Sequence, residues 1–581
     1  MSGIVGAVGH GLPDDEALQA VQAGCAAQRP ESPDSSGTYL DDRAAIGNVR
    51  SAIPDLDDGA QPYVAADGSV LAYDGEAFLQ EWDPRSDTCS LEEAWRTQGL
   101  SLLGKLGALS AFAAWDPEAG GLTLVRDPLG RSPLFFAPLP GGGLAFASEP
   151  KGLRGWPGVD WTIRRPAIAE FLAGSYLSGP RTAWRGVWRL PPGSCLTWRG
   201  GLTAWRPTAG LRTPLAPDPM SPCSLASLWP RLLEAVTRRL AGDRPVGLLL
   251  SGGLDSSMVA AAATSLAGPL PAWTIRWQEV DYDESGHAAD VATHLGLDHT
   301  LVDCCATDLP LHLDELSTAY DEPFADESML PTLLVCRAAA REVRAVLTGD
   351  GGDEAFGGYE RYAYPDCGLD EYLDVFQAAS RATVSTVLGN RGHSCDPWSA
   401  YRPWFSNERE TSPLLRRRRL DVHTYLPDDI LTKIDRVARR SSITARAPFL
   451  DRDLFSWAMS LPCGALVDRG VQKALLRHAA QGRLPSDVLT RPKQGFGVPI
   501  RAWFRGPLLA WLEESLLAGC LAESGWCDGG ALQKVMDEHA SGETDHARLL
   551  LNLVVLERWL RRESNPPAPV PMPEDPPSRD A

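Results

Sequence analysis

The stretch VGLLLSGGLDSS, at residues 246–257, narrows the choice of fold more than any other part of the chain. Its apolar start predicts a buried strand, and the residues from Ser256 onward predict a helix. Two similar units follow, since PAWTIRW precedes a helix predicted from Glu284, and AVLTG at 345–349 opens on a Gly/Asp loop. Short buried strands that alternate with amphipathic helices predict a parallel sheet covered on both faces. Ligands of such sheets bind at the carboxyl ends of the strands.

The first 200 or so residues have a different rhythm. Short apolar runs separated by turn residues predict a β-rich layered domain, with helices near 14–27 and 91–106 between the strands. The runs are GIVGAVG, AAIGNV, VLAYDGE, LSAFAAWD, LTLVRD, LFFAPL and LAFASE.

The chain of 581 residues is too long for one hydrophobic core, because single cores stop growing at roughly 250–300 residues. We expect a first domain at 1–205, a linker at 206–225 that contains TPLAPDPMSP, and a second domain at 226–563. The Pro-rich residues 564–581 are expected to form a disordered tail.

The composition disfavours several classes of partner. The chain has 55 Lys and Arg against 75 Asp and Glu, and the formal charge of -20 repels phosphate backbones and anionic lipids, so no nucleic acid partner is expected. The basic run at 416–419 is interpreted as a solvated helix face. The 12 cysteines lack the spacing of a zinc site, and the sequence shows no signal-peptide pattern and no membrane-spanning apolar run. We therefore expect a reduced, cytoplasmic protein that does not contact a membrane.

Glycines and a carboxylate follow the strand at 246–250. Ser251, Gly252 and Gly253 lead into the start of a helix, where backbone N–H groups approach an anion closely and the helix dipole adds partial positive charge. Asp255 would repel a bound phosphate unless a cation lay between them, so it is interpreted as a magnesium ligand. The alternative is an ordinary strand-to-helix turn in which Ser256 caps the helix.

Long strings of the second half resemble one family. SGGLDSS is similar to the pyrophosphate-binding loop of N-type ATP pyrophosphatases, which cleave ATP to AMP and pyrophosphate. From about 230 to 515 the chain resembles glutamine-dependent asparagine synthetases, through YDESGHAADVATHLGLDH, DEPFADESMLPT, LTGDGGDEAFGGYERY, YLPDDILTKIDRVAR, ARAPFLDRDL, QKALLRHAA and RPKQGFGVPIRAWF in the family's order. The resemblance implies an α/β protein. An N-terminal four-layered α/β/β/α sandwich (Ntn-hydrolase-like) would precede a parallel-sheet synthetase domain similar to adenine-nucleotide α-hydrolases, with a helical C-terminal part.

The resemblance also implies ATP and Mg²⁺ as cofactors and assigns roles to matching residues. Lys473 matches the lysine that stabilises negative charge at the α-phosphorus and on leaving pyrophosphate, and Asp350 lies where an acidic residue helps to deprotonate the incoming amine. Asp255 and Asp353 are the implied metal ligands. The expected ATP-binding residues are Leu250, Ser251, Gly252, Gly253, Asp255, Ser256, Ser257, Ile275 and Gly349.

Some of these assignments have alternatives. Arg477, one helical turn after Lys473, and Arg491 and Lys493 are second candidates for the cation. GDGGDE, at 349–354, could instead be a surface turn rich in Asp and Gly.

The N-terminal half resembles class II glutamine amidotransferase domains through MSGIVG, YDGE, RDPLGRSPLFF and FASEPKGL, but Ser2 stands where the family has its cysteine nucleophile. A serine hydroxyl is the weaker nucleophile, although N-terminal serines serve in some hydrolases of this architecture. The family's Arg-Gly-Pro-Asp loop is altered to RPESPD at 29–34, and its oxyanion-stabilising Asn-Gly pair is Asp74-Gly75, where a carboxylate would repel an oxyanion. We therefore expect an inactive, degenerate glutaminase site at Ser2, Arg50, Asp74, Gly75 and Asp87.

The synthetase half departs from the asparagine pattern at 438–444, where the family's S-M-A-x-S-L-E is replaced by ARRSSIT. Two arginines for apolar residues, and a threonine for a glutamate, would change the charge of the wall of the acceptor pocket. A surface stretch that is free to vary is the alternative.

These observations predict an AMP-forming amide ligase that adenylates a carboxylate and transfers it to an amine. We favour specialised metabolite or peptide chemistry, as in β-lactam synthetases and lasso-peptide cyclases, which also lack the cysteine. An asparagine synthetase that uses ammonia or glutamine is the alternative, and a regulator without activity would not be expected to keep the SGGLDSS loop, Asp353 and Lys473. The expected partners are a small-molecule or peptide carboxylate and an amine donor. A homodimer and a second protein that delivers a peptide are compatible with this prediction.

Overall fold

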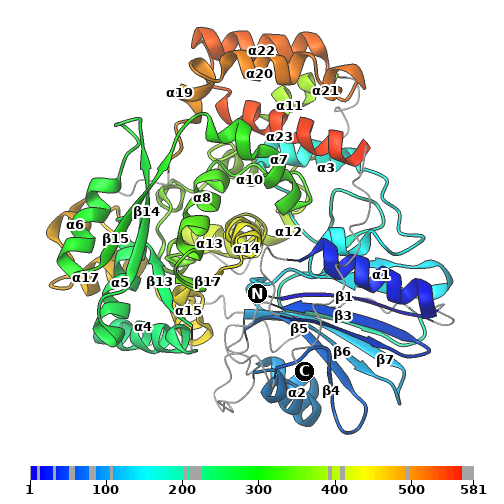
Figure 1. Ribbon diagram of the computed structural model, residues 1–581. Helices are drawn as coiled ribbons and strands as arrows, with labels where there is room; N and C mark the ends of the chain where they lie inside the picture. Colours follow the sequence, from blue (N-terminus) through cyan, green and yellow to red (C-terminus); the bar gives the residue numbers. More distant parts are fainter. Residues whose placement is uncertain are drawn as a thin grey trace. The chain divides into compact units, whose positions relative to one another are not determined.

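The computed structural model describes residues 2–9, 14–29, 35–50, 59–76, 87–104, 109–201, 206–207, 225–242, 244–389, 396–405, 412–491 and 497–564. Two compact units are present, drawn in Figure 1. The first contains Met1–Thr162 and Trp184–Leu211, and the second contains Ile163–Ala183 and Arg212–Ser564. The segment Ile163–Ala183 thus belongs to the second unit, although the predicted first domain, 1–205, includes it. Most of the predicted linker and tail lie outside the described residues.

The first unit is built on two stacked antiparallel sheets of six strands each. Each of the seven apolar runs recognised in the sequence forms a strand here. One sheet has the order β10-β8-β9-β1-β3-β2, and its strands are β1 (Ser2–Val8), β2 (Ser35–Leu40), β3 (Ala44–Arg50), β8 (Phe135–Pro138), β9 (Leu144–Ala147) and β10 (Trp188–Arg189). The other has the order β12-β11-β7-β6-β5-β4, and its strands are β4 (Tyr63–Val64), β5 (Val70–Glu76), β6 (Leu109–Asp116), β7 (Gly121–Arg126), β11 (Ser194–Trp198) and β12 (Arg206–Pro207).

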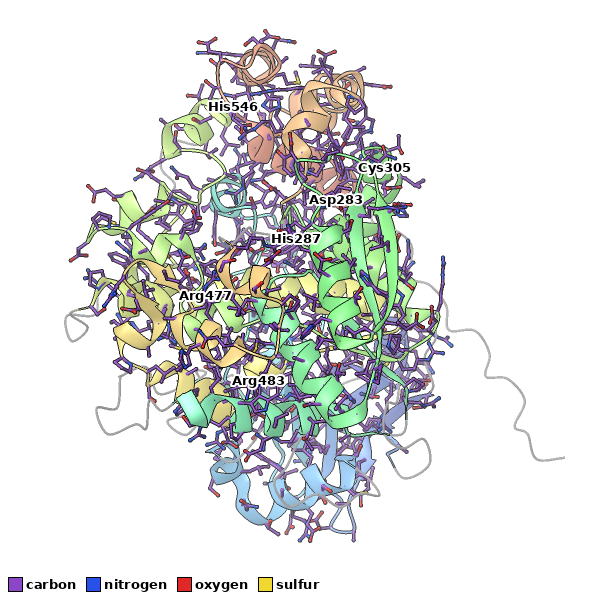
Figure 2. All side chains as sticks on the ribbon, turned by 90° about the vertical axis from the view of Figure 1, so that its left-hand side faces the viewer. Asp283, His287, Cys305, Arg477, Arg483 and His546 are labelled. Carbon is purple, nitrogen blue, oxygen red and sulfur yellow. The ribbon has the colours of Figure 1, made fainter. Side chains whose placement is uncertain are left out.

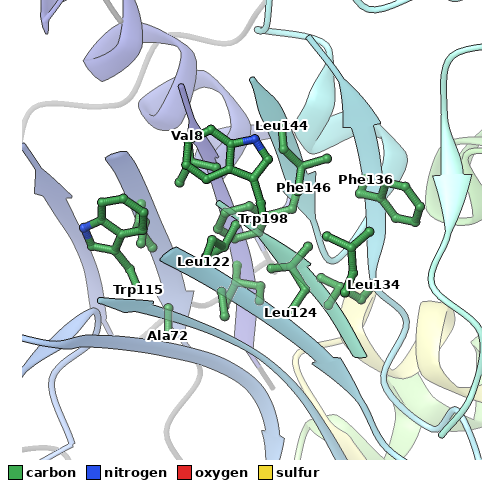
Figure 3. Close-up of a cluster of buried hydrophobic side chains, with 14 of the residues drawn as sticks. Val8, Ala72, Trp115, Leu122, Leu124, Leu134, Phe136, Leu144, Phe146 and Trp198 are labelled. Carbon is green, nitrogen blue, oxygen red and sulfur yellow. The ribbon is translucent and has the colours of Figure 1, made fainter. Parts of the chain in front are cut away.

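Successive side chains of β5 point to opposite faces of its sheet and so contribute to two different cores. Val70 and Ala72 belong to the core between the two sheets, whereas Leu71 and Tyr73 face the second core against α2 (Asp87–Gln98). Figure 3 shows the inter-sheet core, where Trp115 and other large apolar side chains pack together. On the outer face of the first sheet lies α1 (Asp14–Ala27), which packs on β1 and β3 (Figure 1). The four layers α/β/β/α confirm the predicted sandwich. The helix predicted at 91–106 begins earlier and ends in a 3₁₀ turn, Gly99–Gly104.

The second unit contains a five-stranded parallel sheet in the order β15-β14-β13-β16-β17. Its strands are β13 (Val246–Leu249), β14 (Pro271–Trp277), β15 (Asp298–Cys304), β16 (Ala345–Leu347) and β17 (Thr444–Arg446). The chain moves outward from β13 through β14 to β15 and then returns to the other side of β13 as β16. The strand order therefore reverses between β13 and β16, and the loops that follow these two strands share one crevice.

Helices cover both faces of this sheet, as the sequence predicted (Figure 1). One layer contains α4 (Leu225–Leu240), α5 (Leu254–Ala267), α6 (Ser285–Leu295) and α17 (Ala474–Ala480). The other contains α7 (Asp308–Tyr320), α8 (Met329–Ala340) and α14 (Leu431–Arg440), which pack on one another. The C-terminal part is helical and contains α19 (Ile500–Arg505), α20 (Leu509–Leu517), α21 (Cys520–Glu523), α22 (Gly529–Ser541) and α23 (Ala547–Ser564). None of the helices described is long and apolar enough to cross a membrane.

The basic run at 416–419 corrects one prediction. It lies in α13 (Pro413–His423), where Arg417 and Arg418 are only 1% and 0% exposed, so the interpretation as a solvated helix face is wrong. The Arg418 guanidinium donates to the backbone carbonyls of Glu354 and Ala355, at 2.9 and 2.8 Å. Hydrogen bonds to main-chain oxygens allow a charged side chain to be buried here.

Candidate functional site

A cavity of about 620 Å³ opens where the strand order reverses, and all of its lining residues belong to the second unit. The turn after β13, the end of β14 and the loop after β16 contribute Ser251, Ile275 and Gly349. The neighbouring backbones of β13 and β16 pair at Leu248 and Leu347, so their two loops emerge side by side. The geometry of the sheet therefore brings the SGGLDSS and GDGGDE segments to one site.

The SGGLDSS turn is held by its own hydroxyls. Ser256 Oγ accepts from the Ser251 backbone N–H at 3.2 Å and lies 3.0 Å from Ser251 Oγ. Gly252 has φ +75°, and a Cβ there would lie 2.7 Å from the backbone nitrogen of Ala288, so this position requires glycine. Gly253 is the N-cap of α5, whose first-turn N–H groups lack intrahelical partners. The turn therefore has the form of an anion-binding helix start.

Lys473 joins this turn to the GDGGDE loop. Its ammonium forms ion pairs with Asp255 and with Asp353, the latter at 2.5 Å, and its side chain is only 6% exposed. Burial alone would lower the pKa of Lys473, but the two carboxylates outweigh it and raise the pKa above the usual lysine value. Lys473 stays charged at neutral pH and fixes both aspartates in the cavity.

Glycines leave space for this arrangement. A Cβ at Gly352 would lie 2.7 Å from Asp255 Cγ, and a Cβ at Gly349 would lie 2.8 Å from the Ser256 nitrogen. At Gly358 the added atom would overlap Asp353 Oδ1 and Lys473 Cε. The sequence reasoning did not single out Gly358, although it lies within the quoted string LTGDGGDEAFGGYERY.

Leu250, Thr274 and Ile275 line the cavity at the ends of β13 and β14, where adenine was expected. The Leu250 carbonyl already accepts a hydrogen bond from the Thr274 hydroxyl, which also lies 2.7 Å from His299 Nε2. Burial lowers the pKa of His299, which favours the neutral ring beside this hydroxyl. The strand ends therefore present a small polar network beside apolar surface.

Two of the expected ATP-binding residues do not line the cavity. Gly252 packs against the start of α6, and the fully buried Ser257 lies within α5. Leu250, Ser251, Gly253, Asp255, Ser256, Ile275 and Gly349 all line it, as do Asp350, Asp353 and Lys473.

The two other candidate cations that the structure describes, Arg477 and Arg491, donate hydrogen bonds to backbone carbonyls. The Arg477 guanidinium, labelled in Figure 2, donates to the backbone carbonyls of Gln472, Leu489 and Arg491. Arg491 donates to the Gly252 carbonyl at 3.3 Å and pairs with Glu284 at 3.4 Å. The Arg491 contact fastens the SGGLDSS turn, and both arginines also line the cavity. Lys493 lies outside the described residues.

The segment 438–444 does not form the wall that the sequence predicted. Arg439 and Arg440 pair with Asp435 and Glu315, at 3.4 and 3.2 Å, and no residue of 438–444 lines the cavity. The wall comes instead from the beginning of the same helix and from the π-helical turn before it, Leu426–Ile430. Positions there, not the arginines, therefore shape this side of the cavity.

That wall contains residues that the sequence reasoning did not identify. Lys433 Nζ donates to Ser328 Oγ at 2.9 Å and lies 3.7 Å from Asp326 Oδ2. Four aromatic side chains, Tyr176, Tyr359, Phe376 and Tyr425, line the cavity beside this group, and we call them the Tyr425 cluster. The signal for the polar members lay in two of the quoted strings, DEPFADESMLPT and YLPDDILTKIDRVAR. Of the aromatic residues, Tyr425 and Tyr359 also lie in quoted strings, whereas Tyr176 and Phe376 come from segments that the sequence reasoning did not quote.

The candidate glutaminase residues lie in the first unit. Ser2 pairs with Arg50 across β1 and β3, but the side chains of Ser2 and Asp87 lie outside the described residues, as does most of the loop at 29–34. The buried Arg50 guanidinium donates to the Gly59 carbonyl. Asp74 is 1% exposed in β5, and Gly75 after it has φ +124°. The described part of this unit thus keeps its strands, with Arg50 and Asp74 buried in them.

The residues present fit a magnesium ion only together with a phosphate ligand. Asp255 and Asp353 offer carboxylate oxygens at one place, which Mg²⁺ prefers. Among the described residues, no group of three or more His, Cys, Asp or Glu side chains is arranged to hold a metal ion. Mg²⁺ commonly binds through one or two carboxylates and the phosphates of a substrate.

Comparison with known proteins agrees with both units. Residues 228–561 match the asparagine synthase family, and residues 1–207 match the glutamine amidotransferase domain. A Mycobacterium tuberculosis protein named "Putative asparagine synthetase [glutamine-hydrolyzing]" is 30% identical over 94% of each chain. Asparagine synthetase [glutamine-hydrolyzing] 1 of Bacillus subtilis is 24% identical over 91% of each chain, and amidase chry2 of Gibberella zeae is 25% identical over 87% of this chain and 88% of that one. The chain belongs to the asparagine synthase family and is an ATP-dependent, asparagine synthetase-like carbon–nitrogen ligase.

Proposed function

We propose that this protein adenylates a carboxylate with magnesium-bound ATP and transfers the acyl group to an amine, releasing AMP and pyrophosphate. The observation that carries the proposal is the buried Lys473 ammonium, ion-paired with Asp353 and with Asp255 in the first turn of α5. A fixed cation at this place is what a reaction needs when negative charge develops on phosphate.

The cavity residues divide the work. The N–H groups at the start of α5 would bind the ATP phosphates, and the ends of β13 and β14 would receive adenine near Leu250 and Ile275. Asp255 and Asp353 would hold Mg²⁺, which neutralises charge on the phosphates. Lys473 would stabilise the α-phosphorus as the substrate carboxylate attacks it and pyrophosphate leaves.

The second step joins acid and amine. The amine nitrogen attacks the acyl carbon, the bond from that carbon to the AMP oxygen breaks, and the amine gives up a proton. Asp350 lines the cavity and is a candidate acceptor of that proton, with one of its oxygens held by the Thr348 hydroxyl at 2.7 Å. Binding both partners in one cavity offsets much of the entropic cost of their encounter.

We further propose that the first unit does not supply ammonia from glutamine. Ser2 replaces the expected thiol, and the buried Asp74 places a carboxylate where the family has an amide. The amine would then be carried by the acceptor, which favours a small-molecule or peptide substrate of specialised metabolism, if needed delivered by a second protein. A homodimer and a cytoplasmic location fit this role.

Asparagine synthesis is the second candidate. The M. tuberculosis and B. subtilis relatives bear that name and align over more than nine-tenths of the chain. Under this alternative the carboxylate is aspartate and the amine is ammonia.

The test is nucleotide-product analysis with magnesium-ATP and aspartate, comparing ammonia, glutamine and no amine, with Lys473→Ala as the inactive control. Release of AMP and pyrophosphate with aspartate and ammonia, but not with glutamine, would establish asparagine synthesis with an inactive first unit. Release with glutamine would show that Ser2 works. No release from folded protein that binds ATP would exclude aspartate and favour a dedicated acceptor. Formation of ADP in place of AMP would overturn the proposed chemistry.

A further inference from the structure

One buried carboxylate oxygen in the cavity wall is left without a hydrogen-bond partner. Asp429 belongs to the π-helical turn before α14, lines the cavity and is 4% exposed, and its Oδ1 has no hydrogen-bond partner among the described residues. An unsatisfied polar atom in a buried position destabilises the fold, so its retention points to a ligand.

The neighbouring carboxylates of this wall have partners of their own. Asp326 accepts from the Ser328 backbone N–H at 2.7 Å and is 3.7 Å from the Lys433 ammonium. Glu327 pairs with Arg548 at 3.4 Å. Lys433 and Arg548 are the cations that act on Asp429, and Lys433 is shared with Asp326 and Asp350. Carboxylates therefore outnumber cations in this part of the wall.

The environment of Asp429 favours its neutral form until a cation arrives. Burial is the main cause, and the nearby Asp326 adds to it, so the pKa of Asp429 lies well above the usual aspartate value in spite of Lys433 and Arg548. By contrast, Lys433 and the hydrogen bonds from Ser328 outweigh burial and lower the pKa of Asp326. A bound cation would restore the charge balance at Asp429.

The surface around Asp429 suits a cation attached to carbon. Tyr425 lies one turn before it, with ring centroids 5.7 Å from Tyr359, 6.1 Å from Tyr176 and 6.4 Å from Phe376. The Tyr359 hydroxyl donates to Glu354 at 2.8 Å, and the Tyr176 hydroxyl is paired with that of Tyr401. The Tyr425 hydroxyl bonds to the Asp429 carboxylate itself, which leaves Asp429 Oδ1 as the oxygen without a partner. With the three hydroxyls engaged, the cluster offers mainly ring surface to the cavity.

A resident arginine does not fill this role. Arg361 stacks 3.9 Å from the Tyr359 centroid and 4.8 Å from the Tyr425 centroid, but its guanidinium pairs with Asp421 at 2.8 Å. Its charge is therefore balanced without Asp429.

We propose that Asp429 binds a primary ammonium group of an organic substrate, whose carbon skeleton packs against the Tyr425 cluster. The inference rests on the proposed function for its place in the reaction. The ammonium belongs either to the attacking amine or to the α-amino group of the acid that is adenylated. In either case the wall selects an amine bound to carbon over free ammonia, because an ammonium ion alone leaves the ring surface uncovered.

The test is a binding measurement that needs no turnover. Ligand-observed NMR titration of the full-length protein compares phenethylammonium chloride with its neutral match, phenethyl alcohol. We expect the ammonium probe to bind the native protein and to bind Asp429→Asn at least tenfold more weakly. Glu327→Gln is the matched control, since it neutralises a cavity carboxylate that already has a partner, and it should change binding less than threefold. Equal binding of the alcohol, or unchanged binding to Asp429→Asn, would overturn the proposal.

A thermal melt separates this role from a structural one. Because Asp429 Oδ1 lacks a partner, Asp429→Asn should melt at or above the native temperature without ligand. A clear drop would show that Asp429 is a structural ion-pair member and would count against the proposal. Competition between L-aspartate and the probe would assign the ammonium to the acid, and simultaneous binding would assign it to the attacking amine. Lys473→Ala should still bind the probe, so loss of ligase activity and loss of this site are distinguishable.

Discussion

The two units of this chain both have buried apolar cores, but they differ in how their candidate catalytic residues are arranged. In the second unit, Lys473, Asp255 and Asp353 converge in one cavity. In the first, the buried Arg50 guanidinium is bonded to the Gly59 carbonyl, and the Asp74 side chain is buried in β5. Both units retain continuous apolar cores. The comparison shows that an intact apolar core does not reveal the chemistry of a unit, so activity has to be argued from the site.

The largest effect is expected from Lys473→Met. Loss of the fixed cation should lower the rate of AMP formation by about 10²–10³-fold. The variant also leaves Asp255 and Asp353 without their shared ammonium, and removing one partner of a buried ion pair costs about 3–5 kcal/mol of stability. Rates should therefore be normalised to the folded fraction measured by circular dichroism. Lys534→Met removes an exposed lysine, 72% exposed in its pair with Glu538, and should change neither quantity. If Lys473→Met were active, the Lys473 group would not be essential for catalysis, and the second unit would no longer differ from the first in this respect.

The next largest effect is expected from Gly358→Ala, which disturbs the position of Lys473 without removing its charge. The added methyl overlaps Asp353 Oδ1 and Lys473 Cε, so the ion pair must shift while every charge is kept. We expect AMP formation to fall about 10²-fold, since small misplacements of catalytic groups cost that much. Gly464→Ala is the matched control, because a Cβ there meets nothing within 4 Å. Equal rates for the two variants would show that the position of the ammonium is not critical.

A third prediction concerns the segment Ile163–Ala183, which joins the second unit although its sequence neighbours belong to the first. Burial, together with Asp428 and Glu322, raises the pKa of Glu170 to about 8. Between about pH 4.3, the unfolded value, and about pH 8 the folded protein holds a proton that the unfolded chain has lost, so stability falls as pH rises.

The variant Glu170→Gln removes this titration. Its melting temperature should exceed the native one by about 2–4 °C near pH 8, and the difference should shrink towards pH 5. The Gln side chain also keeps an oxygen that can accept from the Ser178 backbone N–H, now 2.7 Å from Glu170 Oε1. A pH-independent difference would mean that Glu170 is charged in the folded protein.

Sequence reasoning succeeded where residues act through their neighbours along the chain. Short apolar runs separated by turn residues predicted the strands of the sandwich, and the order of strands and helices predicted the parallel sheet with its loops at one edge. It failed where function depends on contacts between distant segments. Arg418 is buried because carbonyls of Glu354 and Ala355, more than sixty positions away, accept its N–H groups. Phe376 meets the cavity from a segment that no motif marks. Asp429 lies in the quoted string YLPDDILTKIDRVAR, but its place in the cavity wall depends on contacts with segments far away along the chain.

The smallest effect is expected in the first unit. If that unit no longer hydrolyses glutamine, Ser2→Ala should leave both glutamate release and the rate of AMP formation within twofold of the native protein, because no step uses the hydroxyl. The measurement is glutamate release from glutamine in the presence and absence of magnesium-ATP, beside AMP formation with the amine that supports it. Selective loss of glutamate release in Ser2→Ala would reverse the contrast between the units. It would show that a hydroxyl works as the nucleophile there despite the buried Asp74, and it would make glutamine the source of the amine that reaches Lys473 and Asp350.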